Sequence, residues 1–248
     1  MNFVLIGENN LLTPKGRRKA TTMKKYTLGF NSILFTLFTA FLFVTVQGAS
    51  ALTVNFTNPS PITIPLVGNA TPYPATVNVI GLSGPITDVN VTLTGLSHEF
   101  INDVGVLLVG PGGQSVVLFD GIGGNTAIPA TSPVNIVLDD QASQSLPAGT
   151  ISSGTFKPTN LITSPPDVFP PPAPGSGYGS LLSGFNGTSP NGTWRLFIED
   201  FSPPFSGSVA GGFGLQITAR DVPEPASVFL VGLGFLVSAA WLRRREIS

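Results

Sequence analysis

The 248-residue chain contains no cysteine, a single histidine and few charged residues. Without cysteine, disulfide scaffolds, thiolate zinc sites, cysteine proteases and CxxC redox centres are excluded. A single histidine, His98, excludes any site that requires two imidazoles. Charged residues make up 10% of the chain, whereas 29 glycines and 23 prolines together account for about a fifth of it. Because typical soluble domains are roughly 25% charged, this composition predicts a turn-rich, β-rich and exported protein.

Charge is distributed unevenly along the chain. Six of the twelve basic residues lie in the first 25 positions, and three arginines lie near the other end. Residues 52–222 contain three basic and ten acidic residues, a formal charge of −7. A surface of this sign repels nucleic-acid phosphates and favours divalent cations, so no nucleic-acid partner is expected.

A secretory signal peptide is expected over residues 23–51. Met23-Lys24-Lys25 supplies a positive region, residues 33–46 form an apolar run, and Ala49-Ser50-Ala51 supplies a cleavage site whose small residues are Ala49 and Ala51. The run is short for a spanning helix, so a retained anchor is the weaker alternative. Residues 1–22 fit no targeting pattern, and we interpret them as an upstream extension from a wrongly assigned start.

The segment 222–248 carries three features in a fixed order. Pro223, Glu224 and Pro225 come first, 17 residues without charge follow (226–242), and Arg243, Arg244 and Arg245 complete the series. The apolar part barely spans a bilayer as a helix, and the arginines suit a stop signal on the cytoplasmic side. Together these features resemble the PEP-CTERM sorting signal of Gram-negative-type bacteria. The resemblance implies a single transmembrane sorting helix, recognition and cleavage by an exosortase, and delivery to the cell surface or an exopolysaccharide matrix; a plain tail anchor is the alternative.

The sequence pattern of residues 52–221 predicts one all-β domain. Short alternations of apolar and polar residues recur between glycine-rich turns, and no convincing helix pattern occurs. The pattern predicts a jelly-roll-like β-sandwich of about eight or nine strands. Strands are expected at residues 53–56, 76–80, 87–93, 104–109, 115–119, 135–138, 194–199 and 213–217. Seven prolines between residues 158 and 174 exclude a central strand there and predict a long excursion or lid.

The order of turn and strand blocks over residues 88–219 resembles the P domain, or Homo B domain, of kexin-like proprotein convertases. The blocks that carry the resemblance are His98 with Asp103-Val104, Pro111-Gly112-Gly113, Asp139-Asp140-Gln141-Ala142, Gly192-Thr193-Trp194-Arg195-Leu196 and Asp200. The resemblance implies an eight- or nine-stranded jelly roll without a catalytic centre, since the convertase protease is a separate, preceding domain. Glu99 and Phe100 depart from the family pattern, so the local turn after His98 is expected to differ.

The chain is not expected to be an enzyme. His98-Glu99 begins like the HExxH motif of zinc proteases, but Asn102 stands where the second histidine would be. A serine–histidine–aspartate triad would have to use His98, and no G-x-S-x-G elbow occurs in the sequence. We expect the His98 ring to bond a loop carbonyl and Trp194 to lie in the core. A serine endopeptidase activity would belong to the family's neighbouring domain.

Carboxylates at predicted strand ends are candidate calcium ligands, because Ca²⁺ prefers carboxylate and carbonyl oxygens. P domains are calcium-stabilised, so the resemblance points the same way. Candidates are Asp103, Asp120, Asp139, Asp140 and Asp200, with Asp103, Asp139 and Asp140 as the preferred set. The alternative is that they are ordinary turn aspartates whose side chains bond the local backbone.

These patterns predict a non-catalytic, exported protein of the cell surface or extracellular matrix, held transiently in the membrane by its C-terminal helix. Its expected role is structural or adhesive, with exosortase machinery and an exopolysaccharide or surface protein as partners. The competing hypothesis is an accessory module that binds or stabilises a separate secreted serine protease. Tyr73, Tyr178 and Phe205 lie among prolines and glycines, where they form an exposed aromatic patch or, more simply, anchor loops.

Overall fold

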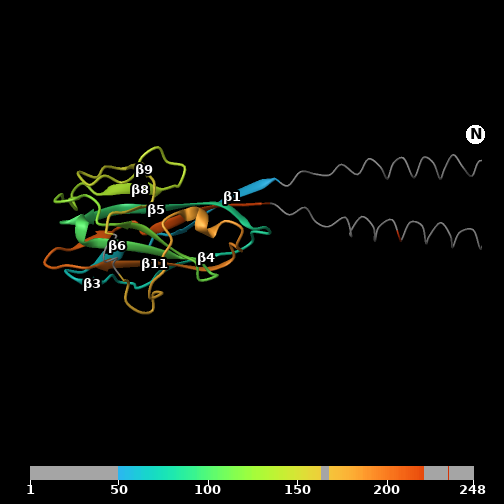
Figure 1. Ribbon diagram of the computed structural model, residues 1–248, viewed down its shortest axis with the longest axis horizontal. Helices are drawn as coiled ribbons and strands as arrows, with labels where there is room; N and C mark the ends of the chain where they lie inside the picture. The colour runs from blue at the N-terminus through green and yellow to red at the C-terminus, as the bar shows by residue number, and fades with distance from the viewer. Residues whose placement is uncertain (1–49, 163–167, 221–233, 235–248) are drawn as a thin grey trace, which may run out of the picture. The chain divides into compact units, whose positions relative to one another are not determined.

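The structure, a computed structural model, describes residues 50–162, 168–220 and 234, and it is all-β (Figure 1). Thirteen strands and two short 3₁₀ helices occur in these residues. The elements are β1 (Ala51–Asn58), β2 (Ile62–Ile64), β3 (Gly68–Asn69), β4 (Ala75–Val79), β5 (Ile86–His98), η1 (Ile101–Asp103), β6 (Val104–Val109), β7 (Ser115–Asp120), β8 (Val134–Leu138), β9 (Gly154–Phe156), β10 (Thr159–Asn160), η2 (Leu182–Phe185), β11 (Gly192–Asp200), β12 (Gly207–Val209) and β13 (Phe213–Arg220).

The first sheet is built around β5, the longest strand. Its order is β1-β13-β5-β12-β2, while β8 pairs with the other edge of β5 and β9 pairs with β8. β13 covers the first half of β5 and β12 covers its last three residues, so two different strands extend one edge. All pairs in this sheet are antiparallel except β8 with β9, which makes the sheet mixed.

The second sheet is built around β6 and β11. Its order is β10-β7-β6-β11-β3, and β4 pairs with the edge of β11 that β3 also occupies. In the view of Figure 1 the layer with β5, β8 and β9 lies above the layer with β4, β6 and β11. The two sheets pack face to face, because one core cluster takes side chains from both of them.

The core between the sheets follows directly from the period-two alternation of the strands. Val89, Val91 and Leu93 of β5 are buried on one side, and alternate residues of β11 are buried on the other. Trp194 is fully buried, donates its indole N–H to the Pro190 carbonyl (2.9 Å) and packs edge-on against Phe185. The prediction that Trp194 is a core residue is therefore confirmed.

A second apolar cluster covers the far side of the second sheet. Leu107 and Val109 of β6, Val117 of β7 and Phe197 of β11 point away from the shared core and are buried beneath Phe169 and Ala173. β6 is thus buried on both of its faces, which agrees with its continuous apolar sequence. We call residues 168–178, which lie over this face, the strap; it is the gold loop below β11 in Figure 1.

Two tyrosines hold the strap in place. Tyr73 donates its hydroxyl hydrogen to the Pro170 carbonyl (3.0 Å), and Tyr178 donates to the Pro174 carbonyl (2.6 Å). The Tyr178 hydroxyl also accepts the Phe169 N–H (3.2 Å). Loop anchoring is therefore confirmed for both tyrosines, whereas Phe205 is 36% exposed and stacks on Phe100.

All eight expected strands are present, and five further strands of two or three residues were not predicted. One of these, β10, lies inside the proline-rich segment and pairs with β7 in parallel at the edge of the second sheet. The prediction that this segment contains no central strand holds for its described part. Among the described residues, none belongs to a helix long and apolar enough to cross a membrane.

Candidate functional site

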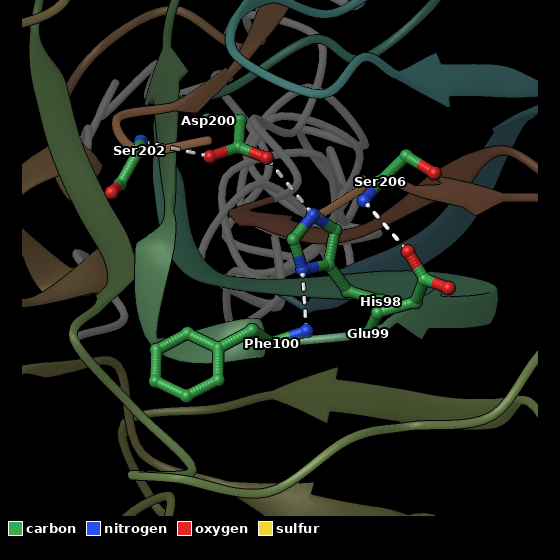
Figure 2. A network of polar contacts seen from close by, with 6 residues as sticks. All are labelled: His98, Glu99, Phe100, Asp200, Ser202 and Ser206. Atoms are coloured by element: carbon green, nitrogen blue, oxygen red, sulfur yellow. Dashed lines mark hydrogen bonds and ion pairs between the residues drawn. The ribbon is translucent and has the colours of Figure 1, made fainter. Parts of the chain in front are cut away.

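His98, the only histidine of the chain, is the last residue of β5 and is buried against the end of β11 (Figure 2). Its Nδ1 accepts the Phe100 backbone N–H (3.1 Å), and its Nε2 lies 3.1 Å from Oδ2 of Asp200. Because Nδ1 is an acceptor, the network assigns the ring proton to Nε2, which donates to the carboxylate. The other Asp200 oxygen, Oδ1, accepts the Ser202 N–H (3.0 Å).

This arrangement makes His98 a bridge between the β5–η1 turn and the end of β11. The prediction that its ring bonds a loop carbonyl is wrong, since its partners are a backbone N–H and a carboxylate. Both ring nitrogens are engaged and the side chain is 1% exposed, so neither nitrogen is left to take a proton from a serine hydroxyl. In this geometry the bridge holds two strand ends together.

Tight backbone contact explains why the neighbouring strand carries a glycine. A Cβ at Gly207 of β12 would collide with the Ser97 backbone carbonyl oxygen and would lie 2.6 Å from Cδ2 of His98, so a side chain there would push β12 away from β5 and the ring. Next to it, Glu99 and Ser206 bond each other twice: the Glu99 N–H donates to the Ser206 carbonyl, and the Ser206 N–H donates to Glu99 Oε2 (both 3.2 Å). These bonds fix the turn at which the sequence departs from the P-domain pattern.

The carboxyl groups of Asp200 and Asp103, next to the His98 bridge, are partly shielded from water, which disfavours their charged forms. Burial raises the pKa of Asp200, although the Ser202 N–H and His98 oppose the shift. Burial also raises the pKa of Asp103, and the nearby charge of Asp200 adds to that effect. Each of these groups therefore holds a proton more readily than in water.

Glu199 lies on the opposite face of β11, under the strap. It is 7% exposed, and burial together with the neighbouring charge of Asp200 raises its pKa to about 7. Its Oε2 accepts no hydrogen bond from any described residue. Its partner across the strand pair is Gly105, where a Cβ would lie 2.7 Å from the Phe201 ring and 3.1 Å from the Phe169 ring. Glycine at this position lets the aromatic rings close over the sheet.

The structure does not bring the three preferred calcium ligands together. Asp103 lies at the His98 end of β5, close enough to Asp200 and His98 to feel their charges. Asp139 and Asp140 follow β8. They lie near Asp88, which is close to the start of β5 and therefore at the opposite end of that strand from His98. Asp88 and His98 are ten positions apart along β5, which is roughly 30 Å at about 3.3 Å per residue. One ion therefore cannot be held by all three aspartates.

The individual aspartates have local roles. Asp140 accepts the N–H groups of Leu182 (2.9 Å) and Ser183 (2.7 Å) and so caps η2, while Asp139 Oδ1 accepts the Gln141 N–H (2.7 Å). Asp120 is buried at the end of β7. Within the described part of the chain, no group of three or more histidine, aspartate or glutamate side chains is arranged to hold a metal ion. The predicted calcium set does not fit the observed geometry.

Sequence reasoning missed a groove on the outer face of the first sheet. It has a volume of about 530 Å³ and is lined by β1, β5, β8, β13 and the turn before β13. Its polar side chains come from Asn55, Thr57, Asn90, Thr92, Thr94 and Gln216. The alternation of β5 places Asn90, Thr92 and Thr94 opposite its core residues, but the sequence alone does not show which other strands lie beside them.

Several predicted residues lie outside the described part of the chain. These are Ala49 of the signal peptide, Pro223, Glu224 and Pro225 of the sorting motif, and the arginines at positions 243–245. Ala51 is described: it is the first residue of β1 and pairs with Arg220 of β13.

Residues 221–245 match the sequence model of the PEP-CTERM protein-sorting motif. This match confirms the sorting signal predicted over residues 222–248. Such a motif implies recognition by exosortase machinery, export and membrane-associated sorting to the cell surface.

Two solved structures are distantly similar to the chain. One is a structure of the Aeromonas sobria serine protease and chaperone complex. The match covers 75% of this chain and 29% of the matched chain, with 15% sequence identity and a TM-score of 0.33. The other is a structure of the Aeromonas sobria serine protease. The match covers 68% of this chain and 26% of the matched chain, with 14% sequence identity and a TM-score of 0.29. The chain thus spans less than a third of these proteins, and overlaps this loose do not establish a shared fold. No curated protein matches the chain in sequence.

Proposed function

We propose that the chain is a non-catalytic protein of the cell surface or extracellular matrix, whose β-sandwich is displayed there for structural or adhesive binding of a glycan or protein. The observation that carries this proposal is the PEP-CTERM match at residues 221–245, immediately after the last strand of the sandwich. A sorting signal directly after a folded domain is what a displayed binding module requires.

The chemistry of the domain supports the non-catalytic part of the proposal. The one histidine is enclosed between Phe100 and Asp200, so the most common general base is committed to a strand junction. The outer face of the first sheet supplies a candidate binding surface. As a finer part of the proposal, we interpret the sandwich as a jelly roll of the P-domain type.

The sorting part can be tested by replacing the motif Pro223-Glu224-Pro225 with three alanines in the native host. Surface and membrane fractions are then compared with those of the parent chain. Loss from the surface and accumulation of an unprocessed, membrane-held form is expected. Equal surface delivery of both chains would refute exosortase sorting. Replacing the exposed pair Thr76 and Asn78 of β4 by alanine provides the control, since these residues lie far from the motif in sequence.

Calcium stabilisation stays a prediction of the P-domain interpretation, although the preferred ligand set does not fit one site. A thermal melt in excess calcium and in chelator tests it, because a ligand at 100 times its Kd stabilises the native state by about 2.7 kcal/mol. A raised midpoint in calcium would support a site at one end of β5. Comparing Asp103→Ala with the Asp139→Ala, Asp140→Ala double variant would then show which end. An unchanged melting temperature would mean that these aspartates bind no calcium and serve only to stabilise the local backbone.

The competing function, an accessory module for a secreted serine protease, makes a different prediction. The chain would then co-purify with a protease from culture medium and would raise the melting temperature of that protease. Retention on polysaccharide without any associated protease would favour the adhesive function.

A further inference from the structure

We propose that the groove on the outer face of the first sheet binds an uncharged polysaccharide. This inference rests on the proposed adhesive function and names both its site and its ligand class. The groove crosses four adjacent strands in the order β1, β13, β5 and β8. Since neighbouring strands lie about 4.8 Å apart, it is about 14 Å wide across the sheet.

The polar side chains of this face form rows that run from strand to strand. Asn55 of β1, Gln216 of β13 and Asn90 of β5 lie opposite one another. Gln216 Nε2 donates to Asn55 Oδ1 (3.2 Å), and Asn90 Nδ2 donates to Gln216 Oε1 (3.3 Å) and to Asp88 Oδ2 (3.2 Å). The row therefore fixes the orientation of its amide groups before any ligand arrives, which lowers the entropy cost of binding.

The next row supplies the floor of the groove. It consists of Thr57, Gly214, Thr92 and Val137, one residue from each of the four strands. Gly214 has no side chain to fill the space between the two threonines, and a Cβ there would lie 3.1 Å from Thr57 Cγ2. The depression is therefore a direct consequence of glycine at an outward position of β13.

The amide row also has an acceptor that the protein does not use. Asn90 Oδ1 is covered from solvent and accepts no hydrogen bond from the described residues. An acceptor that is buried without a hydrogen-bond donor destabilises the folded protein, so a donor supplied by a ligand would be favourable here. After a small rotation of the Asn90 side chain, Oδ1 could accept a hydrogen bond from a hydroxyl group of a ligand bound over the row.

The chemistry of the lining selects an uncharged, hydroxyl-rich ligand. None of the described residues that line the groove is charged, although residues 52–222 carry a formal charge of −7. Amides and hydroxyls both donate and accept, which matches sugar hydroxyl groups, whereas anionic chains would be repelled by the surrounding domain. Protein interface cores are enriched in aromatic residues and arginine, and the only aromatic residue of the lining, Phe213, is 2% exposed with its side chain in the core.

The size and shape of the groove agree with a chain-like ligand. A volume of about 530 Å³ lies within the roughly 300–1,000 Å³ of small-molecule sites. The groove is partly open to solvent rather than enclosed, so a segment of a longer polymer can lie in it.

The test measures retention of the full-length chain, purified in mild detergent, on immobilised polysaccharides. Dextran, laminarin and galactomannan represent uncharged chains, and alginate and polygalacturonate represent anionic ones. Groove variants are Asn55→Ala with Gln216→Ala, and Gly214→Ala, which fills the floor. The matched control is Thr76→Ala with Asn78→Ala, exposed strand positions of the second sheet. Thermal melts confirm that every variant is folded.

The expected result is salt-insensitive retention on at least one uncharged polysaccharide. The Asn55, Gln216 double variant should weaken this retention by about tenfold or more, because two ligand hydrogen bonds are lost. Gly214→Ala should weaken it as well, and the control should bind like the parent chain. No retention on any uncharged polysaccharide, or retention only on anionic chains with loss at high salt, would overturn the inference.

The outcomes separate this inference from the broader proposal. Retention that is equal in the parent chain, the groove variants and the control would refute the groove but keep an adhesive protein whose site lies elsewhere. Capture of a protein partner that the groove variants abolish would refute the polysaccharide ligand and keep the surface. Failure of surface sorting, measured separately, would refute the proposed location whatever the groove binds.

Discussion

Both outer faces of the sandwich are built from alternating strands. The first is open and polar, whereas the second is covered and apolar over β6, β7 and the end of β11 and open at β4. Outward positions of the first sheet hold Asn55, Thr92 and Gln216, which remain at least partly exposed. Outward positions of the second sheet hold Leu107 and Phe197, which are buried beneath the strap. The side chains at every second position therefore decide whether a sheet face meets water or another layer of protein.

Covering the second face has an electrostatic consequence. Glu199 shares that face with Phe197 and is buried with it, so its pKa rises to about 7. Burial and the Glu199 charge also raise the pKa of Tyr73, which anchors the strap. The first face has no comparable buried acid among its groove residues, since the lining that the structure describes is uncharged.

The largest loss of stability is expected in the core that both sheets share. Trp194→Ala removes a fully buried indole and its hydrogen bond to Pro190, so the free energy of unfolding should fall by about 3–5 kcal/mol. Urea denaturation followed by circular dichroism measures this change. A variant that unfolds at the same urea concentration as the parent would contradict the buried position of Trp194.

A smaller but still large effect is expected on the covered face. Phe169→Ala removes the main apolar contact of the strap with the second sheet and should lower the free energy of unfolding by roughly 3 kcal/mol. Phe205→Ala is the matched control, because this ring is 36% exposed and stacks on Phe100; its loss should be below about 1 kcal/mol. Equal losses for the two variants would mean that the strap contributes no more than a surface loop.

The buried acid should make stability depend on pH. Because the folded-state pKa of Glu199 is about 7 and therefore above its ordinary value, the native state binds the proton more tightly than the unfolded chain. Stability contributed by the protonated form is then lost as the pH rises towards 7. When the pH is raised from 5 to 8, the ionisation of Glu199 should lower the free energy of unfolding by roughly 1–3 kcal/mol.

Glu199→Gln, which keeps the shape without the charge, isolates this effect. The variant should be more stable than the parent at pH 8, and its stability should vary less between pH 5 and pH 8. Asp88, Asp103 and Asp200 have pKa values raised by burial as well, so a weaker pH dependence should remain. Identical pH profiles of the parent and the variant in thermal melts would show that Glu199 is well solvated.

The smallest effect is expected on the open face. Asn55 and Gln216 are exposed, so replacing both by alanine should change the free energy of unfolding by no more than about 0.5 kcal/mol for each residue. Chemical denaturation of the double variant measures this. A loss of several kcal/mol would mean that the amide row is needed for folding, which would remove the groove from consideration as a surface kept for binding.

The longer strands, and the residues of each that point inward, could be predicted from the amino-acid sequence. The alternation around Val89, Val91 and Leu93 and the continuous apolar run of β6 were sufficient for this, because side-chain direction in a strand is a local property. The sequence also determined the sorting motif, whose three parts are contiguous. The very short strands were missed because two or three residues give no periodic pattern.

Which of these residues contact one another depends on how the strands pair in the folded domain. β1 pairs with β13, so that Thr53 and Thr218, 165 positions apart, are in hydrogen-bond contact. His98 meets Asp200, and Asn55 meets Gln216, whereas Asp103 lies far from Asp139. Pairing between distant strands depends on the packing of the whole core and not on local sequence. The polar bridge and the groove could therefore be found only after the strands had been placed side by side.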